Sequence, residues 1–516
     1  MSHSGGGNLA ACSSNQELDT APRATTTAVW SGSWVADRLG LSLGTTYSAF
    51  GLELTDLVGL AVRCNPRRAQ LLVSTVLGKH VPTDPRLVYG SGAVLGLLVA
   101  GVLDGPTPHA GRHRDAQLGA ILRDALAGDV GAPRALLAGL ASVNGASNST
   151  PPGSVVLGFA ETATALGHIV ADVLRAPYLH STRRRVPGVV AVGTFEEEHS
   201  HATSHLLLPA DPNFFTTSGP LVLVDDELST GQTALNTIMA LHAVTPRVRY
   251  VIAALVDLRS TEDVQRMATV AAKLGADIDV VALAAGTIQL PSNILDVGQS
   301  LVAAREAADR ISADNRISRD SAWDARSTPA FNSTATDAWP TGLREGARHG
   351  FTPVDKHLLV RTMTAAAFRL ARGFAGGKIL VLGHEELMYA PLCLALALVD
   401  QVPAGARVRF STTTRSPILA VDDLGYAART KLTFPACDDP ADGPGERFAY
   451  NVAAGADPTR HFSDIVLVID SPAETPALHR PAGLLSVLRE VCDRVHLVVI
   501  PALLPTSPGT PARGHR

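Results

Sequence analysis

Cysteine and surplus charge are both scarce in this sequence. Its 516 residues include five scattered cysteines and no CxxC pair, which argues against a zinc ribbon or a disulfide framework and fits a reducing cytoplasm. Charged residues make up 18% of the chain, below the usual ~25%. Lys and Arg number 44 against 48 Asp and Glu, so the net charge is −4 and nothing points to a nucleic-acid binder, which is usually basic.

Long hydrophobic runs are also missing. The most apolar stretch, Ala93 to Leu103, is about half the ~20 residues that a membrane-spanning helix needs. The N-terminus shows no basic segment followed by an apolar one, as a signal peptide would. With 46% hydrophobic residues the chain is nevertheless rich enough in them to fold. We therefore expect a cytoplasmic protein with no membrane partner.

What the sequence does contain is a repeated alternation of short apolar strands with helices. Uniformly apolar strands of this kind indicate a parallel sheet that is covered on both faces. The expected strands in the first part of the chain are 71–77, 155–159, 178–182, 221–224, 249–256 and 277–283, and the expected helices are 92–103, 163–174, 233–241 and 261–274.

A second α/β pattern follows a stretch rich in Ser, Thr, Asp and Asn. Its expected strands are 379–383, 408–411, 465–469 and 495–499, with a helix at 390–398. At about 150 residues per domain, a chain of this length holds two to four domains. We predict a tail at 1–40, a first α/β domain at 41–290, a linker at 291–345, a second at 346–505 and a tail at 506–516.

The run from Leu221 to Thr233 carries the most chemical information. Four apolar residues form a strand, and the carboxylates Asp225 and Asp226 follow at its carboxyl end, where open α/β sheets bind ligands. A small-residue turn then opens a helix, whose N-terminus presents free N–H groups to a phosphate. The pair of carboxylates would accept hydrogen bonds from sugar hydroxyls, directly or through hydrated Mg²⁺. Together these features predict a ribose 5-phosphate site.

This run resembles the 5-phosphoribosyl 1-diphosphate (PRPP) signature of type I phosphoribosyltransferases. The resemblance implies that fold, Mg²⁺ as cofactor, and Asp225 and Asp226 as catalytic residues that also hold the metal through water or the ribose hydroxyls. A P-loop is excluded, since no Gly-Lys-Ser/Thr follows. The turn implied to bind the 5-phosphate consists of Ser229, Thr230, Gly231, Gln232 and Thr233.

The family also has a diphosphate-binding loop after its first core strand. In this sequence small residues stand at that place, and their N–H groups can face a diphosphate. After the next strand comes Arg183, which resembles the family's basic diphosphate contact, whereas Arg184 and Arg185 are expected in solvent. The loop residues implied to bind PRPP are Glu161, Thr162, Ala163 and Thr164.

The acidic and histidine-rich segment Glu196–His205 lies where the family has a mobile loop. A lid there would keep water from the reactive sugar, and its Glu198, His199 and His201 would act as acid or base or contact the leaving diphosphate. Two alternatives stay open. His201 and His205 are four residues apart and could hold a transition metal, or the segment is a solvated polar loop.

Two further stretches narrow the resemblance to one bacterial family of predicted phosphoribosyltransferases. They are Arg63 to Val81-Pro82 and Thr413-Thr414-Arg415-Ser416-Pro417, and that family has a C-terminal domain named for its Thr-Arg-Ser-Pro (TRSP) motif. The resemblance covers roughly residues 45–500. Its members are often encoded near tellurium-resistance and stress genes, which implies a stress-linked role.

Several polar residues outside the signature are further candidates. Lys79 and His80 follow a glycine and either contact an acceptor or an anion or form a surface turn. In the second domain, polar residues directly follow two expected strands, where a second site would lie. The candidates for that site are Glu385, Glu386, Thr414, Arg415 and Ser416, with weaker ones at 348–350 and 422–423.

Three functions remain compatible with these residues. The first is a Mg²⁺-dependent phosphoribosyltransferase that transfers ribose phosphate from PRPP to a nucleobase-like acceptor. The second is a regulator that senses PRPP or a nucleotide and has lost catalysis. In the third, the C-terminal domain acts on the product of the first. The sequence does not identify the acceptor, and a homodimer is a further expectation.

Overall fold

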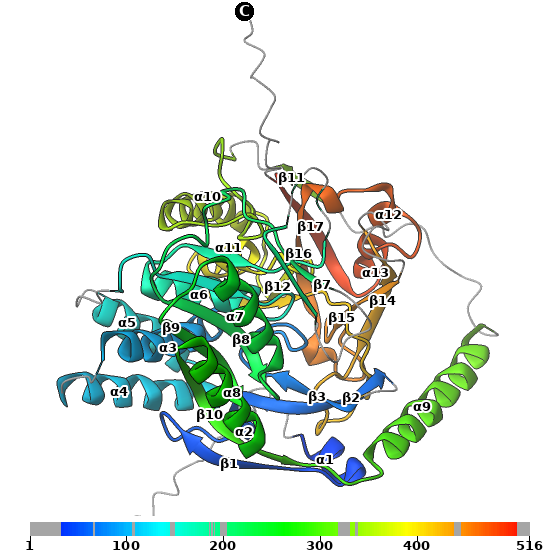
Figure 1. Cartoon of the computed structure of the whole chain (residues 1–516). Coiled ribbons are helices and arrows are strands. Elements are labelled where there is room, and N and C mark those ends of the chain that lie inside the picture. Colours follow the sequence, from blue (N-terminus) through cyan, green and yellow to red (C-terminus); the bar gives the residue numbers. More distant parts are fainter. Residues whose placement is uncertain are drawn as a thin grey trace, which may run out of the picture.

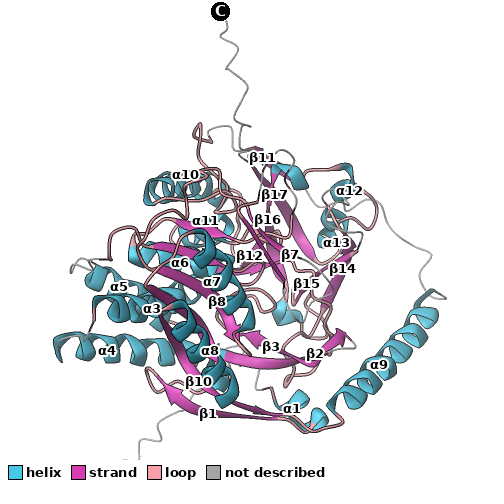
Figure 2. Cartoon of the chain, viewed as in Figure 1, coloured by secondary structure: helices cyan, strands magenta, loops and turns pink. Residues whose placement is uncertain are grey.

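Two parallel sheets, each flanked by helices, form the core of the molecule (Figures 1 and 2). The computed structural model describes residues 32–65, 68–105, 109–144, 150–184, 186, 189, 191–196, 204–317, 331–335, 339–437 and 445–502. The predicted fold class is therefore confirmed: a mostly parallel α/β sheet is followed by a second, C-terminal α/β unit.

The first sheet has six strands in the order β1-β10-β9-β8-β4-β5. All neighbours are parallel except β1, which pairs antiparallel with β10. The direction of the crossovers changes between β4 and β8, and ligands of open α/β sheets bind at such a point, beyond the carboxyl ends. The bounds are β1 Ser42–Ser48, β4 Val155–Gly158, β5 Tyr178–His180, β8 Leu221–Leu228, β9 Arg249–Asp257 and β10 Asp277–Gln289.

Helices cover both faces of this sheet because its strands are apolar on both sides. Val222 and Val224 of β8 belong to the same apolar cluster as α3 (Pro85–Asp104) and α6 (Thr164–Leu174). Leu221 and Leu223 alternate to the opposite face. There they pack with α7 (Gln232–Val244) and α8 (Thr261–Leu274). Figure 1 shows α7 and α8 lying side by side across the sheet.

Helix α3 is longer than the apolar stretch 93–103 suggested. It begins at Pro85, because Asp84 caps it by accepting a hydrogen bond from the backbone N–H of Arg86. By length and composition alone, this helix of 20 residues qualifies as a membrane span, and 67% of its most apolar window is buried inside the protein. It packs against α6 in the core.

The second sheet has five strands, all parallel, in the order β11-β17-β16-β12-β13. One face packs on α10 (Pro353–Ala371) and α11 (Tyr389–Val399), which join the cluster of α3 and α6 and so link the two sheets. The other face packs on α13 (Leu484–Arg489). The strands are β11 Phe331–Ala335, β12 Lys378–Gly383, β13 Arg407–Thr412, β16 Phe462–Asp470 and β17 Cys492–Ile500.

Three antiparallel hairpins complete the strands of the described residues. The strand expected at 71–77 belongs to one of them, so its placement in the parallel sheet was wrong. Its side chains alternate between buried and half-buried, as in a hairpin with one covered face. The hairpins are β2 Val58–Asn65 with β3 Arg68–Ser74, β6 Gly193–Glu196 with β7 Ser204–Leu207, and β14 Lys431–Pro435 with β15 Glu446–Tyr450.

Several further helices lie in segments for which the sequence predicted none. The expected tail at 1–40 ends in α1 (Ser33–Leu39), and the expected linker at 291–345 contains α9 (Ile294–Ile317) and strand β11. The tail at 506–516 lies outside the described residues. The remaining helices are α2 Leu54–Leu57, α4 His109–Leu126, α5 Ala132–Asn144 and α12 Pro476–His479, with short 3₁₀ turns at Pro458–Arg460 and Ser471–Ala473.

Candidate active site

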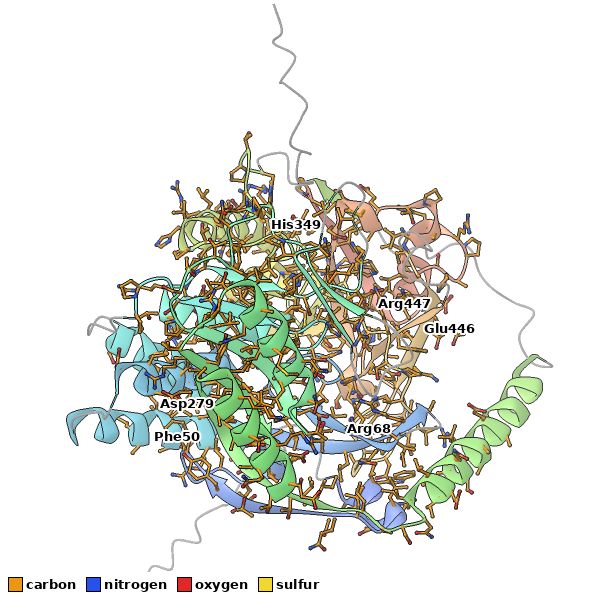
Figure 3. The ribbon with its side chains drawn as sticks, in the orientation of Figure 1. Phe50, Arg68, Asp279, His349, Glu446 and Arg447 are labelled. Carbon is orange, nitrogen blue, oxygen red and sulfur yellow. The ribbon has the colours of Figure 1, made fainter. Side chains whose placement is uncertain are left out.

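The carboxyl ends of strands from both sheets meet at one place. Residues that follow β4 and β5 contact residues that follow β12 and β13: Arg415 pairs with Glu161, and Thr182 donates a hydrogen bond to Glu386. Figure 3 labels Arg68 on the hairpin β2–β3 and, above it in this view, Arg447 on β15. The candidate site is therefore built by both halves of the chain.

The acidic pair lies near the end of β8, as the sequence predicted, although the strand continues to Leu228. Asp225 and Asp226 are both half-buried, and the backbone N–H of Asp226 donates to Asp225 Oδ1 at 3.0 Å. Partial exposure at a strand end leaves the carboxylates accessible to a polar ligand.

The turn after β8 leads directly into α7. Gly231 is the N-cap of this helix and has a φ of +74°, a left-handed conformation that glycine adopts without strain. A Cβ there would lie 3.0 Å from Met267 Cε. Gly231 itself has no side chain to cap the helix, and the N–H of Gln232 donates to Thr230 Oγ1 at 3.3 Å. The N–H groups that follow Gln232 in the first turn of α7 can face an anion, beside the half-buried Ser229, Thr230 and Thr233.

The loop between β4 and α6 is more tightly bonded than expected. The N–H groups of Ala163 and Thr164 bond to carbonyls of the same loop, and that of Ala160 bonds to Ser181 Oγ. Ala163 and Thr164 therefore do not offer N–H groups to a diphosphate. Within the described part of the chain, the N–H groups of Glu161 and Thr162 have no acceptor. These two groups are the ones that this loop can present.

Lys79 contacts this loop, so the surface-turn alternative for Lys79 and His80 does not hold. The Lys79 ammonium donates to Thr162 Oγ1 at 2.8 Å and lies 3.6 Å from Glu161 Oε2. The preceding Gly78 has a φ of +67°, and a Cβ there would lie 2.5 Å from Phe410 Cδ1. Glycine at this position thus lets strand β13 approach and hold Lys79 over the loop.

His80 is buried next to Lys79. Burial, with the charges of Lys79 and Arg63, lowers the pKa of His80 well below its usual value, so the ring is neutral. In the part of the chain that the structure describes, its Nε2 atom has no hydrogen-bond partner. A neutral imidazole in this place can donate to, or accept from, an incoming ligand.

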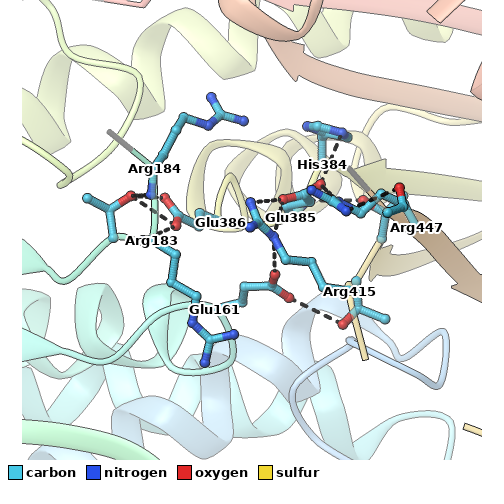
Figure 4. Close-up of polar contacts among 12 residues, drawn as sticks. Glu161, Arg183, Arg184, His384, Glu385, Glu386, Arg415 and Arg447 are labelled. Carbon is cyan, nitrogen blue, oxygen red and sulfur yellow. Dashed lines mark hydrogen bonds and ion pairs between the residues drawn. The ribbon is translucent and has the colours of Figure 1, made fainter. Parts of the chain in front are cut away.

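Glu161 is the electrostatic centre of the loop. Burial raises the pKa of its carboxyl, but Lys79, Arg415 and Arg183 outweigh burial, and the pKa is lowered. Glu161 is therefore an anion held by several cations in an almost fully buried position. Figure 4 shows its carboxylate facing Arg415, with Arg183 beside it.

The arginines after β5 differ from the prediction in one respect. Arg183 lies near Glu161, and its backbone N–H donates to Glu386 Oε1 at 3.1 Å. Arg184 was expected in solvent, but its guanidinium forms an ion pair with Asp470 at 2.9 Å. Asp470 is buried at the end of β16, and its charge requires a cation. Arg185 lies outside the described residues.

The proposed second site in the C-terminal domain is not separate from the first. Arg415 bridges Glu161 at 3.0 Å and Glu385 at 2.6 Å, and Thr414 Oγ1 donates to Glu161 Oε2 at 3.2 Å (Figure 4). Ser416 takes part only through its backbone, which bonds to Thr414 Oγ1 and Tyr450. The candidates of the two domains thus form one cluster.

Other members of the cluster were missed or only weakly indicated by the sequence. Arg447 pairs with Glu385, and Arg348 pairs with Glu386, Glu345 and Asp470. Asp470 ends a buried apolar strand, and a polar residue at that position indicates a ligand site. Nothing local in the sequence distinguishes Arg447 or Glu345 from surface residues. Arg348 stands in the stretch 348–350 that was a weak candidate.

The segment Glu196–His205 begins and ends in the hairpin β6–β7. His205 is buried, and its Nδ1 atom lies 2.8 Å from Ser181 Oγ. Glu198, His199 and His201, the candidate lid residues, lie outside the described residues, as does one half of the alternative His201–His205 metal pair. Among described residues, no group of three or more His, Cys, Asp or Glu side chains could hold a metal ion.

Glu227, directly after the acidic pair, should make the stability of the folded protein depend on pH. Burial, with the charge of Asp226, raises its pKa to about 7, whereas an unfolded glutamate titrates near ~4.3. Between these pH values the folded state holds a proton that the unfolded state has released, so stability falls as pH rises. We expect E227Q to remove this fall. Relative to the wild type, the free energy of unfolding of E227Q should be higher at pH 8 than at pH 5 by an amount on the order of 2 kcal/mol.

Thermal unfolding midpoints at both pH values would measure the effect of E227Q. The matched control is E262Q, on the exposed surface of α8, which should keep the pH dependence of the wild type. An unchanged pH dependence in E227Q would contradict the raised pKa.

Two family models match separate parts of the chain. Residues 57–287 match the family described as phosphoribosyl transferase. Residues 345–488 match the TRSP domain, described as lying C-terminal to that transferase. The two matches agree with the family and with the arrangement, a transferase followed by a TRSP domain, that the sequence predicted.

Solved structures of adenine phosphoribosyltransferases match about 30% of this chain. The Leishmania donovani structure is 18% identical, with a TM-score of 0.21, and the match covers 30% of this chain and 65% of that one. The Giardia lamblia structure with 9-deazaadenine is 21% identical, with a TM-score of 0.22, and the match covers 29% of this chain and 80% of that one. The Trypanosoma brucei structure with AMP, pyrophosphate and ribose-5-phosphate is 15% identical, with a TM-score of 0.21, and the match covers 30% of this chain and 68% of that one. The comparison with curated proteins found no match.

Proposed function

We propose that this protein is a Mg²⁺-dependent phosphoribosyltransferase that transfers the 5-phosphoribosyl group of PRPP to a nucleobase-like acceptor. One observation carries the proposal. The acidic pair lies near the end of β8, the N-terminus of α7 follows β8, and the loop with Glu161 follows β4, the neighbour of β8 in the sheet. Three groups suited to a sugar, a monophosphate and a diphosphate therefore meet at the carboxyl edge where this kind of sheet binds ligands.

The ribose phosphate half of PRPP fits the end of β8 and the turn after it. Asp225 and Asp226 accept hydrogen bonds from the ribose hydroxyls, and the turn Ser229–Thr233 binds the 5-phosphate with N–H and hydroxyl groups. Two half-buried carboxylates also suit Mg²⁺, which usually takes one or two carboxylates, with substrate phosphates and water as its other ligands. When bound, the metal would neutralise charge on the diphosphate.

The diphosphate half fits the loop after β4. The N–H groups of Glu161 and Thr162, the hydroxyl of Thr162 and the nearby cations Lys79 and Arg183 surround this position. His80, neutral and buried next to Lys79, is our candidate for contact with the acceptor.

In the reaction, a nitrogen of the acceptor attacks C1 of the ribose. The bond from C1 to the diphosphate oxygen breaks, and diphosphate leaves with the electron pair. Positive charge develops on the sugar ring, and the carboxylates of Asp225 and Asp226 stabilise it. The segment Glu196–His205 would exclude water as a lid. A cytoplasmic location, a homodimer and a link to stress remain predictions from the sequence.

Calorimetric titration of the full chain with PRPP, with and without Mg²⁺, tests the proposal. We expect PRPP to bind, and to bind more tightly with Mg²⁺, since the metal offsets repulsion between the diphosphate and the carboxylates. Absence of binding in both conditions would refute it. Binding without release of diphosphate for any acceptor would favour the PRPP-sensing regulator instead.

A further inference from the structure

Arg415 of the TRSP motif connects the two domains at the diphosphate loop. Its guanidinium lies 3.0 Å from Glu161 in the first domain and 2.6 Å from Glu385 in the second. The neighbouring Thr414 donates a hydrogen bond to Glu161 as well. Figure 4 shows Arg415 between these two carboxylates. The C-terminal domain thereby places a planar cation and a hydroxyl on the loop of the first domain.

Three cations gather around the loop. Lys79, Arg183 and Arg415 all act on the carboxylate of Glu161, which is almost fully buried, and Glu385 and Glu386 supply two further carboxylates close by. Cations concentrated around one short loop form a site for a ligand with more than one negative charge. In this structure the anion in contact with Lys79 and Arg415 is the protein's own Glu161.

We propose that Arg415, with Thr414, is part of the diphosphate-binding site and is supplied to it by the TRSP domain. Glu161 and Glu385 hold the guanidinium in place while no diphosphate is bound. An incoming diphosphate group, free or as part of PRPP, takes over the contact with Arg415 from Glu161. This inference rests on the proposed function and deepens it, because it gives the C-terminal domain a role at the same site.

Binding of three ligands separates the diphosphate half of the site from the sugar half. PRPP, inorganic diphosphate and ribose 5-phosphate are each titrated, with Mg²⁺, into the wild type, R415Q and R415K. We expect R415Q to bind PRPP and diphosphate about 10- to 100-fold more weakly, with ribose 5-phosphate nearly unchanged. R415K, which keeps the charge but loses the forked geometry, should be intermediate.

The matched control is R429Q. Arg429 lies in the same domain with the same exposed fraction, 16%, but pairs with Asp422 outside the cluster, and its replacement should leave all three affinities unchanged. If the wild type binds all three ligands and R415Q binds them equally well, or loses all three alike, the role of Arg415 is refuted and the proposed function stands. If the wild type binds neither PRPP nor ribose 5-phosphate, the role of Arg415 and the proposed function are both refuted.

A second variant tests the exchange of anions and does not depend on the folding of R415Q. E161Q removes the internal anion, so its thermal unfolding midpoint should fall without ligand. Inorganic diphosphate should raise that midpoint more in E161Q than in the wild type, because the ligand no longer competes with a carboxylate. An equal or smaller rise in E161Q would contradict the exchange and favour a purely structural ion pair.

Discussion

Replacing Asp225 and Asp226 together by asparagine is expected to reduce the release of diphosphate from PRPP by about 1,000-fold or more. In the proposed mechanism the two carboxylates both bind the ribose hydroxyls and stabilise positive charge on the ring. Asparagine keeps the size of each side chain but loses its charge. A diphosphate-release assay with the acceptor found for the wild type measures the effect.

A control for this double variant comes from the opposite edge of the same sheet. Asp277 and Asp279 lie at the amino end of β10, where they are exposed or half-buried. D277N with D279N makes the same change of charge away from the site, and the turnover should match that of the wild type. Full turnover in the double variant D225N with D226N would refute the assignment of the active site.

Replacing Glu385 by glutamine is expected to lower the free energy of unfolding by about 3 to 5 kcal/mol. Glu385 is almost fully buried and pairs with both Arg415 and Arg447. Removing its charge takes away the carboxylate that pairs with Arg447 and leaves Arg415 paired with Glu161, where water cannot easily reach either guanidinium. Chemical denaturation, followed by a signal from each domain, measures the loss.

An exposed acid of the same domain provides the comparison for E385Q. Asp493 pairs with His461, and its side chain is 64% exposed. D493N should therefore change the stability by less than about 1 kcal/mol. Equal stability of E385Q and D493N would show that the two arginines are neutralised without Glu385.

The local signals of the sequence predicted the centre of the site well. The strand, acidic pair and turn from Leu221 to Thr233 are contiguous, and their order alone places them at one sheet edge. The strands and helices with uniformly apolar faces were found for the same reason. Edge strand β1 was missed because each of its side chains is exposed or half-buried, and α9 because its polar sequence looks like a linker.

The contacts between the two domains could not be predicted in the same way. Which carboxylate meets Arg415 depends on the order of strands in both sheets and on how α3 and α6 pack against α11. A buried charge such as Arg447 looks like a surface charge when only its sequence neighbours are known. The sequence therefore suggested two separate sites where the structure has one shared cluster.

The shared cluster also bears on how this protein can evolve. A change of charge at Glu161 in one domain removes one of the two carboxylates that Arg415 in the other contacts, and a change at Arg184 removes one of the two guanidinium groups that contact Asp470. Such a substitution persists only when the opposite domain changes with it. The two domains should therefore vary in matched pairs of residues and be inherited together, and exchange of one domain between distant relatives should yield inactive chimeras.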